Sequence, residues 1–182
     1  MARDFDVPEG DERYFEEAKP VRVFDSNLLR EPLSVLPHGK LILLSPHDTV
    51  TEAVRTMQAE HRGYVLVTRD GSSESEVVGI FTERDVLLRI VDRGRNPATL
   101  PLGDVMTTEP ETLPVNASIA YLLNKMSVGG FRHVPVVDER GHPVFVVAVR
   151  DVVELLVKSF PREVLNLREF DAPAIPRTRE GA

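Results

Sequence analysis

The stretch GIFTERDVLL, residues 79–88, places a hydroxyl and a carboxylate three residues apart, at Thr82 and Asp85, between two apolar runs. If a strand ends here and a helix begins, these side chains could cap the helix, as a threonine and an acidic residue three positions later do in a capping box. The carboxylate could instead accept hydrogen bonds from the two adjacent hydroxyls of a ribose, with Thr82 adding a third contact. The residue types and their spacing fit both interpretations.

A second stretch, FVVAVRDVVELL at residues 145–156, repeats this pattern with one loss. Asp151 matches Asp85, but Ala148 stands where the first stretch has Thr82. An alanine side chain can neither donate nor accept a hydrogen bond. A ribose site in the second stretch would therefore lack one polar contact, typically worth about 0.5–1.5 kcal/mol.

The elements that must position these residues also occur twice. An apolar pattern typical of one helix face appears at two places 69 residues apart, at Val50, Ala53, Val54 and Met57 and again at Ile119, Leu122, Leu123 and Met126. Each copy continues with two β-branched apolar runs, which predict buried strands, and then a second helical pattern. One such β-α-β-β-α unit is too small to bury both faces of its sheet. We therefore expect an α/β (α+β) fold in which two units pack with pseudo-twofold symmetry.

The repeat divides the chain into four parts: an N-terminal extension (1–30), a first unit (31–95), a second unit (96–160) and a C-terminal tail (161–182). The end of the tail, DAPAIPRTREGA, contains two prolines and few apolar anchors, so we expect the tail to be partly mobile. Asp48 is the expected N-cap of the first helix, and Asn116 or Ser118 that of the corresponding helix in the second unit.

The composition excludes several classes of protein. The chain has 182 residues, 42% of them hydrophobic, and a net charge of −7, which disfavours unspecific binding to nucleic acid or to a membrane surface. The absence of cysteine excludes disulfides, thiolate catalysis and cysteine-ligated zinc. No segment approaches the ~18 consecutive apolar residues of a membrane helix, and the charged start does not look like a secretory signal. A cytoplasmic protein with no nucleic-acid or membrane partner is expected.

Motifs of catalysis do not emerge from the sequence. There is no Walker-type phosphate loop and no nucleophile elbow. The five histidines lack the spacing of metal ligands. We therefore predict a protein that is not an enzyme and that has neither a metal site nor a catalytic cofactor.

The duplicated order of elements resembles a pair of CBS motifs, also called a Bateman module. The resemblance rests on GDVMTTEPETLPVNASI, RHVPVVDERG and GIFTERDVLL, and it covers about residues 33–158. It implies a stand-alone regulatory module that senses an adenosine compound (AMP, ADP or ATP) in the cleft between the two motifs. It also implies a homodimer and a regulated protein that remains to be identified.

The resemblance implies that each pocket takes residues from both motifs. The ligand pocket would be lined by Ile80, Thr82, Arg84, Asp85, Glu111, Thr112, Arg132 and His133. In it Thr82 and Asp85 would contact the ribose, while Arg132 and His133 would supply positive charge for phosphate. A second, weaker pocket would be lined by Ile42, Leu43, Tyr64, Arg150 and Asp151.

A different class of function remains open, a ligand-free scaffold for dimerisation or protein docking. The loss of the threonine at Ala148 favours it. Arg132 could be an ordinary surface charge and His133 a half-buried strand residue, and Arg84 stands in a first helical turn, where the dipole does not favour a cation. Our hypothesis from the sequence is one adenine nucleotide per chain, bound beside Thr82 and Asp85.

Overall fold

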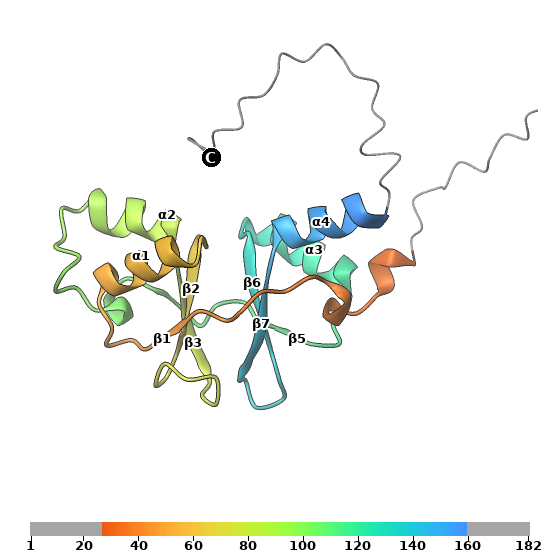
Figure 1. Ribbon diagram of the computed structural model, residues 1–182, viewed down its shortest axis with the longest axis horizontal. Helices are drawn as coiled ribbons and strands as arrows, with labels where there is room; N and C mark the ends of the chain where they lie inside the picture. The colour runs from red at the N-terminus through yellow and green to blue at the C-terminus, as the bar shows by residue number, and fades with distance from the viewer. Residues whose placement is uncertain (1–26, 160–182) are drawn as a thin grey trace, which may run out of the picture.

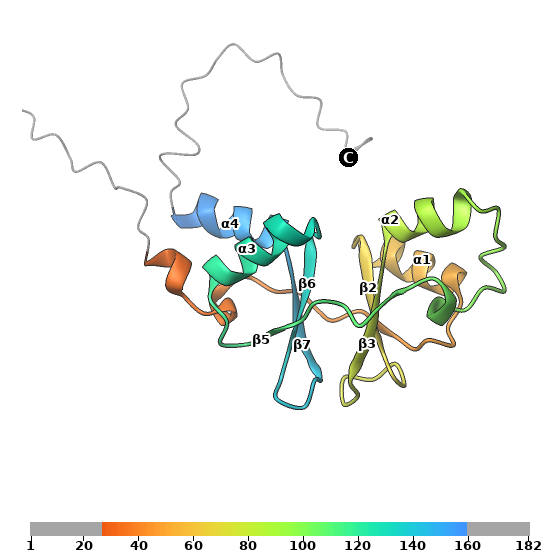
Figure 2. The ribbon, with the colours of Figure 1, turned by 180° about the vertical axis from the view of Figure 1, so that it is seen from behind.

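The computed structural model describes residues 27–159, in which the repeated pattern forms two similar units (Figure 1). The predicted C-terminal tail and residues 1–26 of the N-terminal extension lie outside the described residues. In each unit the helices cover the outer side of a sheet, and the two sheets face each other at the centre of the molecule (Figures 1 and 2). The predicted α/β class and the pairing of two similar units are confirmed.

The first unit contains a four-stranded sheet with the order β1-β2-β3-β4. Its elements are β1 (Leu43–Leu44), α1 (Val50–Ala59), β2 (Tyr64–Thr68), β3 (Val77–Thr82), α2 (Glu83–Asp85) and the π-helical segment η4 (Val86–Val91). The fourth strand, β4 (Thr107–Thr108), pairs antiparallel to β3 although the sequence assigns it to the second unit. The segment that connects the units therefore becomes part of the first sheet.

The second unit contains a three-stranded sheet with the order β5-β6-β7. Its elements are η5 (Leu102–Asp104), β5 (Leu113–Pro114), α3 (Ile119–Gly129), β6 (His133–Val137), β7 (Pro143–Ala148) and α4 (Val149–Ser159). Two short 3₁₀ turns, η2 (Leu28–Arg30) and η3 (Leu33–Val35), precede β1 in the chain. The strand β5 runs parallel to β6, as β1 does to β2.

The helix caps agree with the prediction in one unit and differ in the other. Ser118 caps α3 by accepting the backbone N–H of Tyr121 at 3.3 Å, so it is the correct one of the two candidates. The prediction of Asp48 for α1 is wrong, because Thr49 and Glu52 form a capping box there. The Asp48 carboxylate instead accepts a backbone N–H of the preceding turn at 2.6 Å, which orders the approach to the helix.

The two units exchange the segments that lead into them. Leu33 and Leu36 precede β1 in the sequence of the first unit, yet they are buried in the core of the second. Leu102 and Val105 precede β5 in the sequence of the second unit, yet they are buried in the core of the first. Each unit therefore completes its core with apolar side chains from the other's sequence.

Backbone hydrogen bonds make this exchange symmetrical. The N–H of Leu102 donates to the carbonyl of Asp48 at 2.8 Å, and that of Leu33 donates to the carbonyl of Ala117 at 2.9 Å. Both donors and both acceptors are 69 residues apart, the offset of the repeat. At the centre, the rings of Tyr64 and His133, which share this offset, lie 4.9 Å apart between centroids. This contact therefore lies near the pseudo-twofold axis.

The exchange predicts that the two units unfold together. Truncating the fully buried Leu102 to alanine should cost about 2–5 kcal/mol of unfolding free energy, and the urea transition should remain single because neither core is complete alone. Val128→Ala, at a position 81% exposed on α3, is the control and should change stability by no more than about 0.5 kcal/mol. Two separate transitions in Leu102→Ala would contradict the shared core.

Candidate functional site

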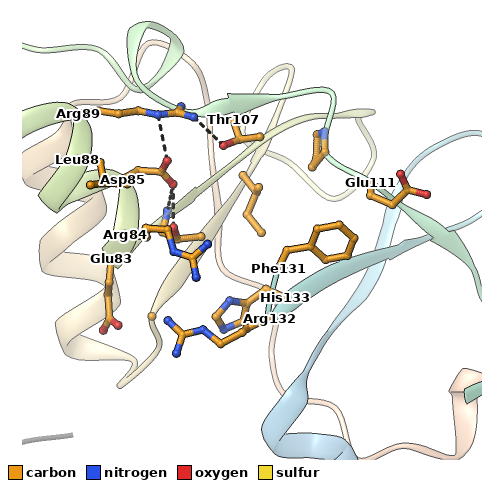
Figure 3. A pocket seen from close by; sticks show the side chains of 14 residues that line it. Glu83, Arg84, Asp85, Leu88, Arg89, Thr107, Glu111, Phe131, Arg132 and His133 are labelled. Carbon is orange, nitrogen blue, oxygen red and sulfur yellow. Dashed lines mark hydrogen bonds and ion pairs between the residues drawn. The ribbon is translucent and has the colours of Figure 1, made fainter. Parts of the chain in front are cut away.

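A cavity of about 310 Å³ lies where the two units meet, beside α2 (Figure 3). The first unit contributes β3, α2, η4 and β4, and the second contributes the residues that lead into β6. The lining residues are Gly63, Ile80, Thr82, Glu83, Arg84, Asp85, Leu88, Arg89, Thr107, Pro110, Glu111, Phe131, Arg132 and His133. The cavity thus has apolar walls, three arginines and three carboxylates.

Most of the residues predicted for the ligand pocket line this one cavity. They are Ile80, Thr82, Arg84, Asp85, Glu111, Arg132 and His133, whereas Thr112 is not among the lining residues. Arg89, Thr107 and Phe131 are among the lining residues that were not predicted for this pocket. Arg89 had a usable signal, because it stands four residues after Asp85, the spacing of a helical ion pair. Thr107 had none, since it reaches the cavity only through the pairing of β4 with β3.

The carboxylate of Asp85 both caps the helix and faces the cavity. Its Oδ2 accepts the backbone N–H of Thr82 at 2.9 Å and the Thr82 hydroxyl at 2.8 Å. Its Oδ1 lies 3.2 Å from Nε of Arg89. The residue is only 7% exposed, and Figure 3 shows it between Arg89 and Arg84. Capping and ligand binding are therefore compatible roles for this side chain.

The second unit separates these two roles. Asp151 is as buried as Asp85, at 8% exposed, and its Oδ2 accepts the backbone N–H of Ala148 at 2.7 Å. The cap is thus present in both units. The hydroxyl of Thr82 has no counterpart, and Leu155 stands where the first unit has Arg89. What distinguishes the first unit is the polar surrounding of its carboxylate, which the cap alone does not need.

Positive charge faces Asp85 from the second unit. Arg132 is exposed, and its side chain makes no hydrogen bond or ion pair within residues 27–159. Arg84 donates from Nη1 to the carbonyl of Gly130 at 3.4 Å, so it bridges the two units beside the cavity. Glu111 is paired with Lys125 at 2.6 Å, which offsets its negative charge. The cavity therefore has an unpaired guanidinium available for an anion.

His133 is not the cation that the sequence suggested. Burial lowers its pKa to about 4, with Arg132 and Arg62 acting in the same direction. The imidazole is accordingly neutral at pH 7. Next to it, burial raises the pKa of Tyr64, an effect that Asp151 reinforces and Arg62 opposes. The positive charge of the site resides in its arginines.

The residues predicted for the second pocket do not line this cavity. Ile42 is buried in the core of the first unit, while Leu43 and Tyr64 belong to the apolar cluster between the sheets. Arg150 is exposed and Asp151 caps α4. A second binding site at these residues stays a prediction.

Comparison with known proteins identifies the family. The model of the CBS domain matches this chain twice, over residues 34–92 and 102–158. The chain belongs to the CBS domain family. Its two units are a pair of CBS domains, and the resemblance noted in the sequence is confirmed.

Relatives of this CBS pair come from distant organisms. The CBS domain-containing protein CBSX3, mitochondrial, of Arabidopsis thaliana is 30% identical over 134 residues, which cover 72% of this chain and 64% of that protein. The chain thus spans less than two thirds of this relative's length. The crystal structure of an uncharacterised conserved protein from Pyrococcus horikoshii is 28% identical, with a TM-score of 0.64 over 70% of this chain and 93% of that one.

A further structural neighbour was solved with a ligand. The CBS domain protein PAE2072 from Pyrobaculum aerophilum, complexed with AMP, is 22% identical, with a TM-score of 0.61 over 70% of this chain and 98% of that one. At this identity the likeness shows the fold alone. In residues 27–159 of the present chain, no helix is long and apolar enough to cross a membrane, and no cluster of acidic or histidine side chains could hold a metal ion.

The lowered pKa of His133 predicts a pH-dependent stability. Between pH 6.5 and 4 the unfolded chain binds a proton at this histidine that the folded chain does not. The free energy of unfolding should therefore fall as the pH is lowered through this window, by about 2–3 kcal/mol from this group. Urea unfolding at several pH values should show a shallower decline in His133→Gln. Equal slopes in the two proteins would contradict a neutral, buried imidazole.

Proposed function

We propose that this CBS pair binds one adenosine compound (AMP, ADP or ATP) in the cavity beside Asp85 and acts as a regulatory sensor. The observation that carries the proposal is the pairing of two groups across the units. A buried carboxylate with a neighbouring hydroxyl lies on one side of the cavity. The guanidinium of Arg132, which has no partner among the described residues, lies on the other. A ribose and a phosphate of one ligand require groups of these two kinds.

The ribose would bind to Asp85. A carboxylate offers about four lone-pair positions, and three contacts occupy part of them here. Among residues 27–159 the one charged partner of Oδ1 is Arg89, with which it forms an ion pair, so it retains capacity for a ribose hydroxyl. Thr82 can turn its hydroxyl from the carboxylate toward the sugar, which frees a position on Oδ2 for the second hydroxyl.

The base and the phosphate would lie on either side of the ribose. Ile80, Leu88 and Phe131 supply apolar surface against which an adenine ring can pack. Arg132 and Arg84 supply the positive charge for phosphate. A neutral His133 can donate a hydrogen bond to a phosphate oxygen without adding charge.

Several substitutions in the second unit argue for a single site. At the positions that correspond to Thr82, Leu88 and Arg89 the second unit has Ala148, Glu154 and Leu155. Phe145 replaces the small Gly79 and is 2% exposed, and the ring of His38 stacks on it at 4.5 Å. Phe145 belongs to the core of the second unit. The loss of the hydroxyl and of the arginine beside the second carboxylate supports one ligand per chain.

The remaining parts of the proposal rest on the family. CBS pairs are regulatory modules, and PAE2072, a neighbour at the level of fold, was solved with AMP. We propose accordingly that the chain has no catalytic activity of its own, and incubation with ATP should yield no hydrolysis product. A cytoplasmic location stays a prediction.

Calorimetric titration with AMP and ATP tests the site. We expect a stoichiometry of one, and Asp85→Asn should weaken binding by about 10- to 100-fold, because hydrogen bonds to a charged group contribute about 1.5–3 kcal/mol. The matched variant Asp151→Asn alters the equivalent cap in the second unit and should leave the affinity nearly unchanged. Two ligands per chain, or equal losses in both variants, would contradict the proposal.

A specific observation also supports the alternative function, a dimerisation platform. Leu87 and Val91 on η4 are 62% and 66% exposed, and Val153 on α4 is 51% exposed. Leu87 and Val153 occupy corresponding positions of the two units, and both helices lie on the same side of the molecule (Figure 1). Exposed apolar side chains gathered on one face are typical of an interface. We propose that two chains pair through this face, with or without ligand.

Light scattering of the purified protein tests the pairing. The wild-type chain should have the mass of a dimer, and the double variant Leu87→Lys, Val153→Lys should have that of a monomer, because burying two charges in an interface is costly. Val144→Lys, an equally apolar-to-charged change at a position 44% exposed on β7, should remain dimeric. A monomeric wild type would rule out this interface.

A further inference from the structure

Arg89 connects three parts of the molecule at the edge of the cavity. Its Nε lies 3.2 Å from Oδ1 of Asp85. Its Nη1 donates to the carbonyls of Val105 and Met106 at 2.7 and 2.5 Å, and its Nη2 donates to the hydroxyl of Thr107 at 3.2 Å. The side chain thus links a carboxylate of the first unit to the segment that leads into the second (Figure 3).

We propose that Arg89 is a positioning residue, which holds the Asp85 carboxylate in the orientation that a ribose requires. The inference rests on the proposed function, since it concerns the same site. Asp85 has a fixed Oδ2, held by the N–H and the hydroxyl of Thr82. Without Arg89 its Oδ1 would have no partner among residues 27–159, and the plane of the carboxylate would be free to turn about that anchor.

The acceptors of Arg89 make it a rigid support. Val105 is buried in the core of the first unit, and Thr107 belongs to β4, which is hydrogen-bonded to β3. A planar guanidinium held by fixed acceptors loses little further entropy when it orients a carboxylate. The orientation of the Asp85 carboxylate therefore depends on the segment that contains Val105 and Thr107 as well as on its own helix.

The contacts of Arg89 disfavour the obvious rival role, that of a direct phosphate ligand. A guanidinium has five N–H groups, and four contacts already engage Nε, Nη1 and Nη2. Little donor capacity remains for a ligand, in contrast to Arg132, which is unpaired within the described residues. Charge for phosphate therefore comes from Arg132, and orientation of the ribose site comes from Arg89.

The second unit provides an internal comparison. Leu155 occupies the position of Arg89, and there Asp151 retains its cap to Ala148. The cap therefore forms without an arginine. The surrounding helix differs as well, because η4 is π-helical where α4 is a regular α-helix. Such π-helical segments are rare and often occur at functional sites.

The test compares ligands that differ in one group, using calorimetry on wild type and Arg89→Leu. AMP against 2′-deoxy-AMP reports the ribose contact, and AMP against adenosine reports the phosphate contact. The wild type should prefer AMP over the deoxy compound by about tenfold. In Arg89→Leu this preference should fall toward one, while the preference for AMP over adenosine stays as in the wild type. The proposal would be overturned if the preference for AMP over 2′-deoxy-AMP were unchanged in Arg89→Leu. It would also be overturned if only the preference for AMP over adenosine were lost.

A second measurement does not depend on any ligand. Amide hydrogen exchange by NMR should show the Thr82 N–H, which donates to Asp85, exchanging about tenfold faster in Arg89→Leu. The Ala148 N–H, which donates to Asp151, should exchange at the wild-type rate. Unchanged exchange at Thr82 would overturn the positioning role even if no adenosine compound binds. If the wild type binds no adenosine compound, yet the Thr82 N–H exchanges faster in Arg89→Leu than in the wild type, only the proposed function is overturned.

Arg89→Lys keeps the experiment decisive if Arg89→Leu unfolds. A lysine retains the charge, but its three donors sit on one nitrogen, which cannot take the separate positions of Nε, Nη1 and Nη2. It should lower the preference for AMP over 2′-deoxy-AMP and speed the exchange of Thr82, each to a degree between wild type and leucine. Full wild-type behaviour of this variant in both measurements would show that charge alone suffices, and would overturn the positioning role.

Discussion

The constraint on which the rest of this structure depends is that the segment before the first strand of each unit packs into the core of the other unit. Leu33 completes the core of the second unit and Leu102 that of the first, both with no exposed surface. Because apolar burial drives folding, the core of each unit is complete only with the segment that the other contributes. The exchange also carries the connecting segment across the first sheet, where β4 pairs with β3 and brings Thr107 to the cavity. Without the exchange the cavity would lack one of its walls.

The duplicated chain separates structural from functional requirements within one molecule. An aspartate caps the last helix of each unit, so this contact belongs to the fold. Thr82 and Arg89 surround only the first carboxylate, and the second unit has apolar residues in their places. These polar groups contact the buried carboxylate but are not needed for its cap. They therefore indicate a site with a role beyond capping the helix. The asymmetry of the two units is thus more informative than either unit alone.

Charge in this acidic protein is organised locally. The net charge of −7 keeps unspecific anions away, while Arg84, Arg89 and Arg132 converge on one cavity. Their surroundings differ, because Arg89 is engaged by protein acceptors, whereas the side chain of Arg132 has none within residues 27–159. Burial beside two arginines keeps His133 neutral. A residue type that suggests a cation in the sequence can therefore act as an uncharged hydrogen-bond donor in the folded protein.

The sequence by itself determined the two β-α-β-β-α units, because apolar periodicity and strand propensity are local properties that the repeat displays twice. It also indicated half of the residues that line the cavity, since Thr82, Asp85 and Arg132 stand at ends of predicted elements. Only the tertiary structure decided the exchange of Leu33 and Leu102, the neutral state of His133 and the role of Arg89. The reason is physical: the partners of Arg89 include backbone carbonyls, which every residue carries, and burial depends on packing between segments far apart in the chain. Neither leaves a mark in the local pattern of residues.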